Sequence, residues 1–117
     1  MSTYKAVFSD IDGTLLTSEH IVSTATIEAI ASLQDKNIPF VIISSRSASC
    51  IYPILEKHHF QCPIVACGGA WIEDMNGRIL SNEGMSKQTA ATVIEFMTGK
   101  KIRSRMGHLF RKELDYK

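Results

Sequence analysis

Residues 6–15 read AVFSDIDGTL, a short apolar strand that runs into two carboxylates, Asp10 and Asp12. Because side chains alternate across a strand, these carboxylates point the same way, while Ile11 points back toward the core. Like charges held this close repel each other, and a bound hard cation such as Mg²⁺ offsets the repulsion. The stretch therefore favours phosphoryl chemistry at the end of a strand. An ordinary Asp-Gly turn after the strand is the competing interpretation.

Apolar strands and helical patterns alternate along the first half of the chain. The pattern predicts strands at 4–9, 40–43 and 64–66, with helices at 23–37 and 49–59 between them. This order and spacing are typical of a parallel sheet with helical crossovers. The sequence therefore predicts an α/β fold with a Rossmann-like parallel sheet that contains the first three strands.

The residues that follow the three predicted strands are Asp10, Ser44 and Cys67. Ligands of parallel sheets bind at the carboxyl ends of the strands, so these residues are expected at one edge of the sheet. Ser44 is also a normal strand-end residue, and only its partnership with Asp10 gives it a functional interpretation. Arg46 is interpreted as a surface or helix-start charge in preference to a phosphate clamp.

The second half of the chain has a different pattern. Residues 71–80 are predicted to form a hairpin around an Asn-Gly turn. Ser86 is expected to be the N-cap of a further helix that runs through Met97. The periodicity fades after Lys100, and no regular structure is predicted beyond that residue.

The composition is that of one small globular chain. It has 117 residues, of which 44% are hydrophobic and 21% are charged. No apolar stretch approaches the roughly 20 residues that a membrane helix needs, and the first residues lack the features of a signal peptide, so a cytoplasmic location is expected. Cys50, Cys62 and Cys67 are expected to be buried or half-buried thiols, in preference to metal ligands or disulfide partners.

Charge is distributed unevenly along the chain. Residues 1–99 carry 6 basic and 10 acidic side chains, whereas residues 100–117 carry 7 and 2. A basic tail can attract nucleic acid or anionic lipid. A solvated terminus is the preferred interpretation because no aromatic platform accompanies the charge, so neither a nucleic acid nor a membrane is predicted as a partner.

These motifs together resemble the haloacid dehalogenase (HAD) superfamily. Residues 10–14 match its first motif, Asp-x-Asp-Gly-Thr, and residues 41–46 resemble its second. Residues 67–71, with the hairpin that follows, are similar to a segment of Cof-type phosphatases, whose type IIB (C2) cap follows the third strand. The resemblance implies a partial HAD core at 1–82, followed at 83–117 by the start of a truncated C2-type cap and a basic tail.

The resemblance also implies a reaction and its residues. The reaction is Mg²⁺-dependent hydrolysis of small phosphorylated metabolites, sugar phosphates above all, through an aspartyl-phosphate intermediate. Asp10 would be the nucleophile, Asp12 the acid and base, and both would hold the metal ion. Four further residues would bind the phosphate: Gly13, Thr14, Ser44 and Ser45.

The family pattern includes a Lys after the cap and a later acidic motif, and neither occurs in these 117 residues. Weak or absent turnover by this chain alone is therefore expected. The alternative is a catalytically inactive remnant or interaction module that uses the open edge of its first strand, through which self-association is possible.

Overall fold

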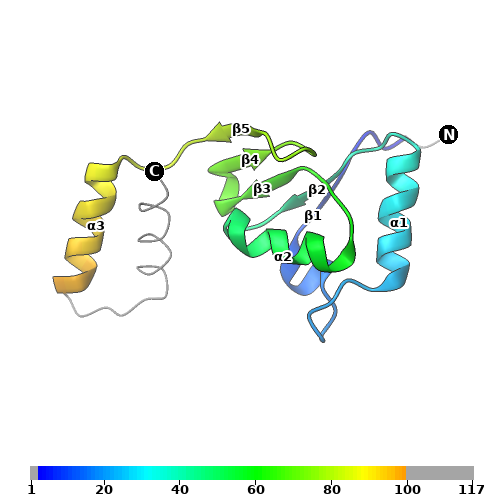
Figure 1. The fold of residues 1–117 in the computed structure, drawn as a ribbon, viewed down its shortest axis with the longest axis horizontal. Coiled ribbons are helices and arrows are strands. Elements are labelled where there is room, and N and C mark those ends of the chain that lie inside the picture. Colours follow the sequence, from blue (N-terminus) through cyan, green and yellow to red (C-terminus); the bar gives the residue numbers. More distant parts are fainter. Residues whose placement is uncertain (1–2, 100–117) are drawn as a thin grey trace. The chain divides into compact units, whose positions relative to one another are not determined.

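The protein is described by a computed structural model that covers residues 3–99. It divides into two compact units, Met1–Glu83 and Gly84–Lys117. The described part of the first unit contains a five-stranded sheet with two α-helices, and the described part of the second contains one α-helix (Figure 1). The prediction that the second part belongs to a cap stays a prediction.

The sheet has the order β1-β2-β3-β4-β5. Its strands are β1 (Val7–Ser9), β2 (Phe40–Ile43), β3 (Ile64–Ala66), β4 (Trp71–Glu73) and β5 (Ile79–Asn82). The first three are parallel, and β4 and β5 continue the sheet as an antiparallel hairpin. The predicted α/β class, with three parallel strands and a following hairpin, is confirmed.

The first strand is shorter than the predicted span of 4–9. Its first bond to the neighbouring chain runs from the Val7 amide to the Pro39 carbonyl, at 2.8 Å. The neighbouring strand begins only at Phe40. Residues before Val7 therefore have no strand beside them on that side to extend the ladder.

The two crossover helices begin and end at local signals. α1 (Thr24–Asp35) begins where the Ser23 hydroxyl accepts a hydrogen bond from the Thr26 amide, at 3.2 Å. Just beyond it, Asn37 adopts a left-handed conformation with φ of 57°, which asparagine tolerates better than most residues. α2 (Ala48–His58) ends similarly, at a left-handed residue. Both helices lie within two residues of their predicted bounds.

The core lies between these helices and one face of the sheet. Phe40, Ile42 and Ile64 point to this face from β2 and β3. They belong to a single buried cluster with residues of both helices and of the loop after β1, among them Ile11, Leu15, Ile30 and Ile51. The complete burial of Ile11 agrees with the expectation that it points toward the core.

The other face of the sheet is less covered. Phe8, in the outermost strand β1, is 61% exposed, and Ile43 at the end of β2 is 39% exposed. Their neighbour Val41 is buried. On this face, β2 is therefore covered at Val41 and open to solvent at Ile43.

The cysteines differ from expectation. Cys62 is buried, as predicted, but Cys50 and Cys67 are exposed. Cys50 lies in the first turn of α2, beside Ile51, which is the residue that enters the core. Cys67 follows β3 in a left-handed conformation, with φ of 53°. The prediction of buried or half-buried thiols is therefore wrong for Cys50 and Cys67.

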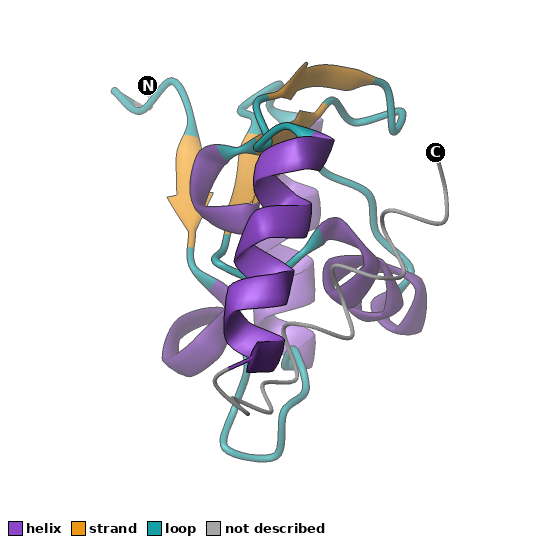
Figure 2. Ribbon diagram, turned by 90° about the vertical axis from the view of Figure 1, so that its left-hand side faces the viewer, coloured by secondary structure: helices purple, strands orange, loops and turns teal. Residues whose placement is uncertain are grey.

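The second unit contains α3 (Lys87–Gly99), which Figure 2 shows as one continuous helix. The Ser86 hydroxyl accepts a hydrogen bond from the Thr89 amide at 3.1 Å, which confirms Ser86 as the N-cap. The basic tail, 100–117, lies outside the described residues. Among the helices of residues 3–99, none has the length and hydropathy to cross a membrane.

Candidate active site

The loop after β1 carries the two predicted catalytic carboxylates. It turns back on itself through hydrogen bonds from the Leu15 amide to the Asp10 carbonyl (3.3 Å) and from the Leu16 amide to the Ile11 carbonyl (3.1 Å). Gly13 allows this turn because it adopts φ of 76°, a conformation that costs other residues energy. Asp10, Asp12 and Thr14 are exposed, whereas the apolar residues between and after them are buried.

The turn after β2 holds Ser44 in a fixed position. Ser44 is only 7% exposed, and its amide donates to the Val65 carbonyl at 2.9 Å. Its hydroxyl accepts a hydrogen bond from the Arg46 amide at 3.0 Å and, within the described residues, donates none. The hydroxyl hydrogen can therefore serve a ligand. Ser45, next in the chain, is exposed.

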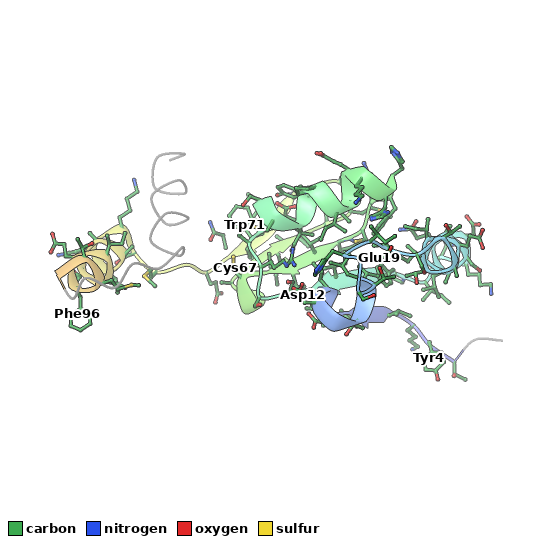
Figure 3. All side chains as sticks on the ribbon, turned by 90° about the horizontal axis from the view of Figure 1, so that it is seen from below. Tyr4, Asp12, Glu19, Cys67, Trp71 and Phe96 are labelled. Atoms are coloured by element: carbon green, nitrogen blue, oxygen red, sulfur yellow. The ribbon has the colours of Figure 1, made fainter. Side chains whose placement is uncertain are left out.

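The turn after β3 binds the turn after β2. The Cys67 amide donates to the Arg46 carbonyl at 2.8 Å, and the Gly68 amide donates to the Ser44 carbonyl at 3.0 Å. Both turns lie at the carboxyl ends of parallel strands. The expectation that polar residues after the three strands lie at one edge of the sheet is confirmed, and Figure 3 shows Asp12 and Cys67 near this edge.

Arg46 joins the loops of β1 and β2. Its Nη2 donates to Asp12 Oδ1 at 2.5 Å and its Nε to Asp12 Oδ2 at 2.9 Å, so the guanidinium binds the carboxylate through two parallel hydrogen bonds. These hydrogen bonds, together with the charge of Arg46, hold the pKa of Asp12 below its usual value. The same interaction raises the pKa of Arg46.

This contact changes the interpretation of Arg46. The residue precedes α2, as expected of a helix-start charge, but its side chain reaches across the sheet edge to a predicted catalytic residue. The sequence favoured a surface or helix-start charge over a phosphate clamp, and neither interpretation pairs Arg46 with Asp12. The basic residue two positions after Ser44 was the available signal.

The predicted site residues come together in part. Asp10 and Asp12 share one loop, Ser44 and Ser45 share another, and Arg46 connects the two. Within residues 3–99, no side chain donates a hydrogen bond to the Asp10 carboxylate, so its oxygens are available to a cation or a phosphoryl group. The positions of Gly13 and Thr14 in the loop are compatible with a phosphate contact, which stays a prediction.

The described residues could supply part of a ligand set for Mg²⁺. No three His, Cys, Asp or Glu side chains of the described residues gather closely enough to hold a metal ion. Mg²⁺ often uses only one or two carboxylates and takes its remaining oxygens from water and substrate phosphate. The unpaired carboxylate of Asp10 and the backbone carbonyl of Asp12 fit that requirement.

A large open groove lies away from these residues. Its volume is about 910 Å³, and it is bounded by α1, α2 and the turn between β4 and β5. It is lined by the residues that lead into β3 rather than by those that follow it, and none of the predicted site residues belongs to it. The groove is therefore separate from the candidate active site.

Known proteins similar to this chain include several phosphatases. The chain is 29% identical over 98 residues to the 5-amino-6-(5-phospho-D-ribitylamino)uracil phosphatase YwtE of Bacillus subtilis, covering 84% of this chain and 34% of the relative. It is 26% identical over 96 residues to the pyridoxal phosphate phosphatase YbhA of Escherichia coli, covering 81% and 35%. The chain thus spans about a third of the length of these relatives.

A comparison with solved structures also finds a similar hydrolase. A haloacid dehalogenase-like hydrolase from B. subtilis superimposes with a TM-score of 0.76 at 28% identity, covering 83% of this chain and 34% of that one. The sequence model of the haloacid dehalogenase-like hydrolases matches residues 7–110, which include both turns of the candidate site and nearly all of the chain. The chain therefore belongs to the haloacid dehalogenase-like hydrolase family.

Proposed function

We propose that this chain carries part of the active site of a Mg²⁺-dependent phosphatase. Its substrates are phosphate monoesters of small metabolites, with sugar phosphates as the expected class. The observation that carries the proposal is the pairing of Asp12 with Arg46, because it brings the loop of the two carboxylates to the turn that presents the Ser44 hydroxyl. The names of two relatives, which refer to a phosphoribityl compound and to pyridoxal phosphate, support the substrate class.

The reaction follows from the two carboxylates. An oxygen of Asp10 attacks phosphorus, the bond between phosphorus and the ester oxygen breaks, and Asp12 gives a proton to the departing oxygen. In the second step Asp12 takes a proton from water as that water attacks the aspartyl phosphate. Inorganic phosphate leaves, and Asp10 regains its carboxylate.

The other proposed residues bind the phosphoryl group. Ser44 offers its hydroxyl hydrogen, and Ser45 and the loop of Gly13 and Thr14 contribute donors around the phosphate oxygens. Mg²⁺, bound to the Asp10 carboxylate and the Asp12 backbone carbonyl, would neutralise the negative charge that meets there.

Beryllofluoride tests this proposal, because with Mg²⁺ it mimics a phosphoryl group on an aspartate. We expect it to raise the melting temperature of the 117-residue chain, and Asp10→Ala to abolish the rise. Asp35→Ala, at an exposed position at the end of α1, is the matched control and should keep the response. An absent response in the wild type, or one that survives Asp10→Ala, contradicts the proposal.

Turnover is a separate expectation. With no Lys and no second acidic motif of the family pattern, this chain should hydrolyse p-nitrophenyl phosphate weakly or not at all. Robust Mg²⁺-dependent hydrolysis that Asp10→Asn abolishes would overturn this expectation, while supporting the proposed chemistry.

A second candidate function, an interaction module, is favoured by one observation. The outermost strand β1 exposes 61% of Phe8, and Ile43 on the same face is 39% exposed. A further strand could pair with this edge. Size-exclusion chromatography with light scattering should then detect self-association that weakens in Phe8→Ser, and a monomer at all concentrations contradicts this candidate.

A further inference from the structure

The backbone of Arg46 is held by hydrogen bonds at both its amide and its carbonyl. Its amide donates to the Ser44 hydroxyl at 3.0 Å, and its carbonyl accepts from the Cys67 amide at 2.8 Å. The side chain leaves this anchored point and reaches Asp12, 34 residues earlier in the chain. Rotation about the side-chain bonds can therefore redirect the guanidinium without moving the sheet edge.

We propose that Arg46 is a positioning residue that exchanges partners during binding: it holds the Asp12 carboxylate in the free protein and transfers its paired N–H donors to the entering phosphoryl group. The inference rests on the proposed phosphatase function and adds to it a role for Arg46, the last residue of the segment 41–46 that resembles the second motif. Its consequence is that phosphate arrival and the release of Asp12 are one event.

The chemistry of the two partners supports this exchange. The guanidinium fork matches pairs of oxygens on carboxylate and phosphate alike, so the phosphoryl group competes for the same two donors. A phosphate monoester carries more negative charge than a carboxylate. The Ser44 hydroxyl, adjacent to the Arg46 amide, supplies a further donor to the same anion.

Because the ion pair of Arg46 and Asp12 is partly exposed, breaking it requires little free energy. The side chain of Arg46 is 36% exposed and that of Asp12 is 55% exposed. Ion pairs with this much water around them stabilise proteins only weakly, so opening this one costs little. A deeply buried pair would instead lock Asp12 in place.

The exchange also matters for the acid and base step. Both oxygens of the Asp12 carboxylate accept from Arg46 in the free protein. Asp12 can take up a proton and pass it to the departing oxygen only after this fork releases at least one of them. Arg46 therefore delays the engagement of Asp12 until a phosphoryl group occupies the site.

The experiment follows the side-chain Nε–H signal of Arg46 by nitrogen-15 NMR in the 117-residue chain, with assignment by its loss in Arg46→Gln. Asp12→Asn should move this signal in the free protein, because it removes the charged acceptor. Addition of inorganic phosphate with Mg²⁺ should move it again, whereas chloride at equal ionic strength should have a smaller effect.

Affinity gives a second readout. Arg46→Gln should weaken phosphate binding roughly fivefold, the effect of losing an exposed charge-assisted pair. Arg46→Lys, which keeps the charge but lacks the fork, should restore part of the affinity. Arg78→Gln removes the same charge from the exposed hairpin and should leave the affinity unchanged.

The outcomes separate this inference from the proposed function. Phosphate binding with an unmoved Arg46 signal and an unchanged affinity in Arg46→Gln overturns the exchange and leaves the phosphatase proposal standing. Absence of phosphate binding in the wild type counts against both. Whether or not phosphate binds, an Arg46 signal that does not change in Asp12→Asn overturns the positioning role.

Discussion

Glu73 holds a buried carboxylate between α2 and the hairpin. The residue is 4% exposed, and its Oε1 accepts hydrogen bonds from the Tyr52 hydroxyl and from Trp71 Nε1, the latter at 2.9 Å. Tyr52→Phe deletes one of these donors while keeping the aromatic ring. We predict that this substitution lowers the free energy of unfolding, because the carboxylate stays buried with one donor fewer.

The magnitude follows from the exposure of the donor. A hydrogen bond to a charged group contributes roughly 1.5–3 kcal/mol when it is well buried. Tyr52 is 38% exposed, so water replaces part of the lost bond and the expected loss is about 1 kcal/mol. For a unit of this size that loss lowers the melting temperature by about 4–8 °C.

Urea unfolding at pH 7 measures this loss through the fluorescence of Trp71, the single tryptophan of the chain. Tyr52→Phe, Glu73→Gln and the double variant together form a double-mutant cycle. This cycle gives the coupling energy between the two side chains, expected at about 1 kcal/mol. Glu83→Gln, exposed in the same unit, is the control and should change stability by less than about 0.5 kcal/mol. A coupling energy below about 0.3 kcal/mol would refute the reasoning.

The pH dependence of stability provides an independent check. Burial, followed by the hydrogen bond and charge of Glu73, raises the pKa of Tyr52 from 10.0 to about 12. The unfolded chain therefore releases this proton first, and the stability that depends on it is complete below pH 10 and declines as the pH rises toward 12. Tyr52→Phe should flatten this decline, and an unchanged slope would contradict the assignment.

Three further predictions concern the cysteines and Gly13. Ellman's reagent should label Cys50 and Cys67 in the native protein and Cys62 only after unfolding, and three rapidly labelled thiols would contradict the described burial. Burial raises the pKa of Cys62 from 9.0 to about 11. The free energy of unfolding, measured with urea, should therefore fall as the pH rises from 9 to 11. A fall of equal size in Cys62→Ala would refute this cause. Gly13→Ala should lower the free energy of unfolding by about 1 kcal/mol. The cost comes from the backbone, whose φ of 76° disfavours alanine, because no neighbouring atom would clash with the added methyl group. An unchanged melting temperature would contradict that strain.

The sequence was sufficient to predict the features of the fold that depend on residues close together in the chain. Ser23 caps α1 through a residue three positions away, and Asn37 ends it by adopting a conformation that few other side chains tolerate. The apolar run at 40–43 placed β2 correctly because its composition alone favours a strand. Alternation with helices then implied the parallel order.

The sequence was insufficient where structure depends on distant segments. The pairing of Arg46 with Asp12 requires the register of β1 against β2, which brings together residues 34 positions apart. Tyr52 and Trp71 find Glu73 only after α2 packs against the sheet. No local pattern specifies such contacts, so the sequence could propose the residues of the site but could not predict the contacts between them.

If the proposed function holds, phosphate recognition and turnover require different groups. Ser44 and Arg46 are held by backbone hydrogen bonds within Met1–Glu83, so a phosphoryl group can meet preformed donors in this chain. Turnover needs a firmly held metal ion as well, and among residues 3–99 only the Asp10 carboxylate and the Asp12 carbonyl are assigned to it. The Lys and the second acidic motif of the family pattern do not occur in these 117 residues, which span about a third of the length of the two relatives. Measurable binding of phosphate analogues without comparable hydrolysis is therefore the behaviour expected of these 117 residues.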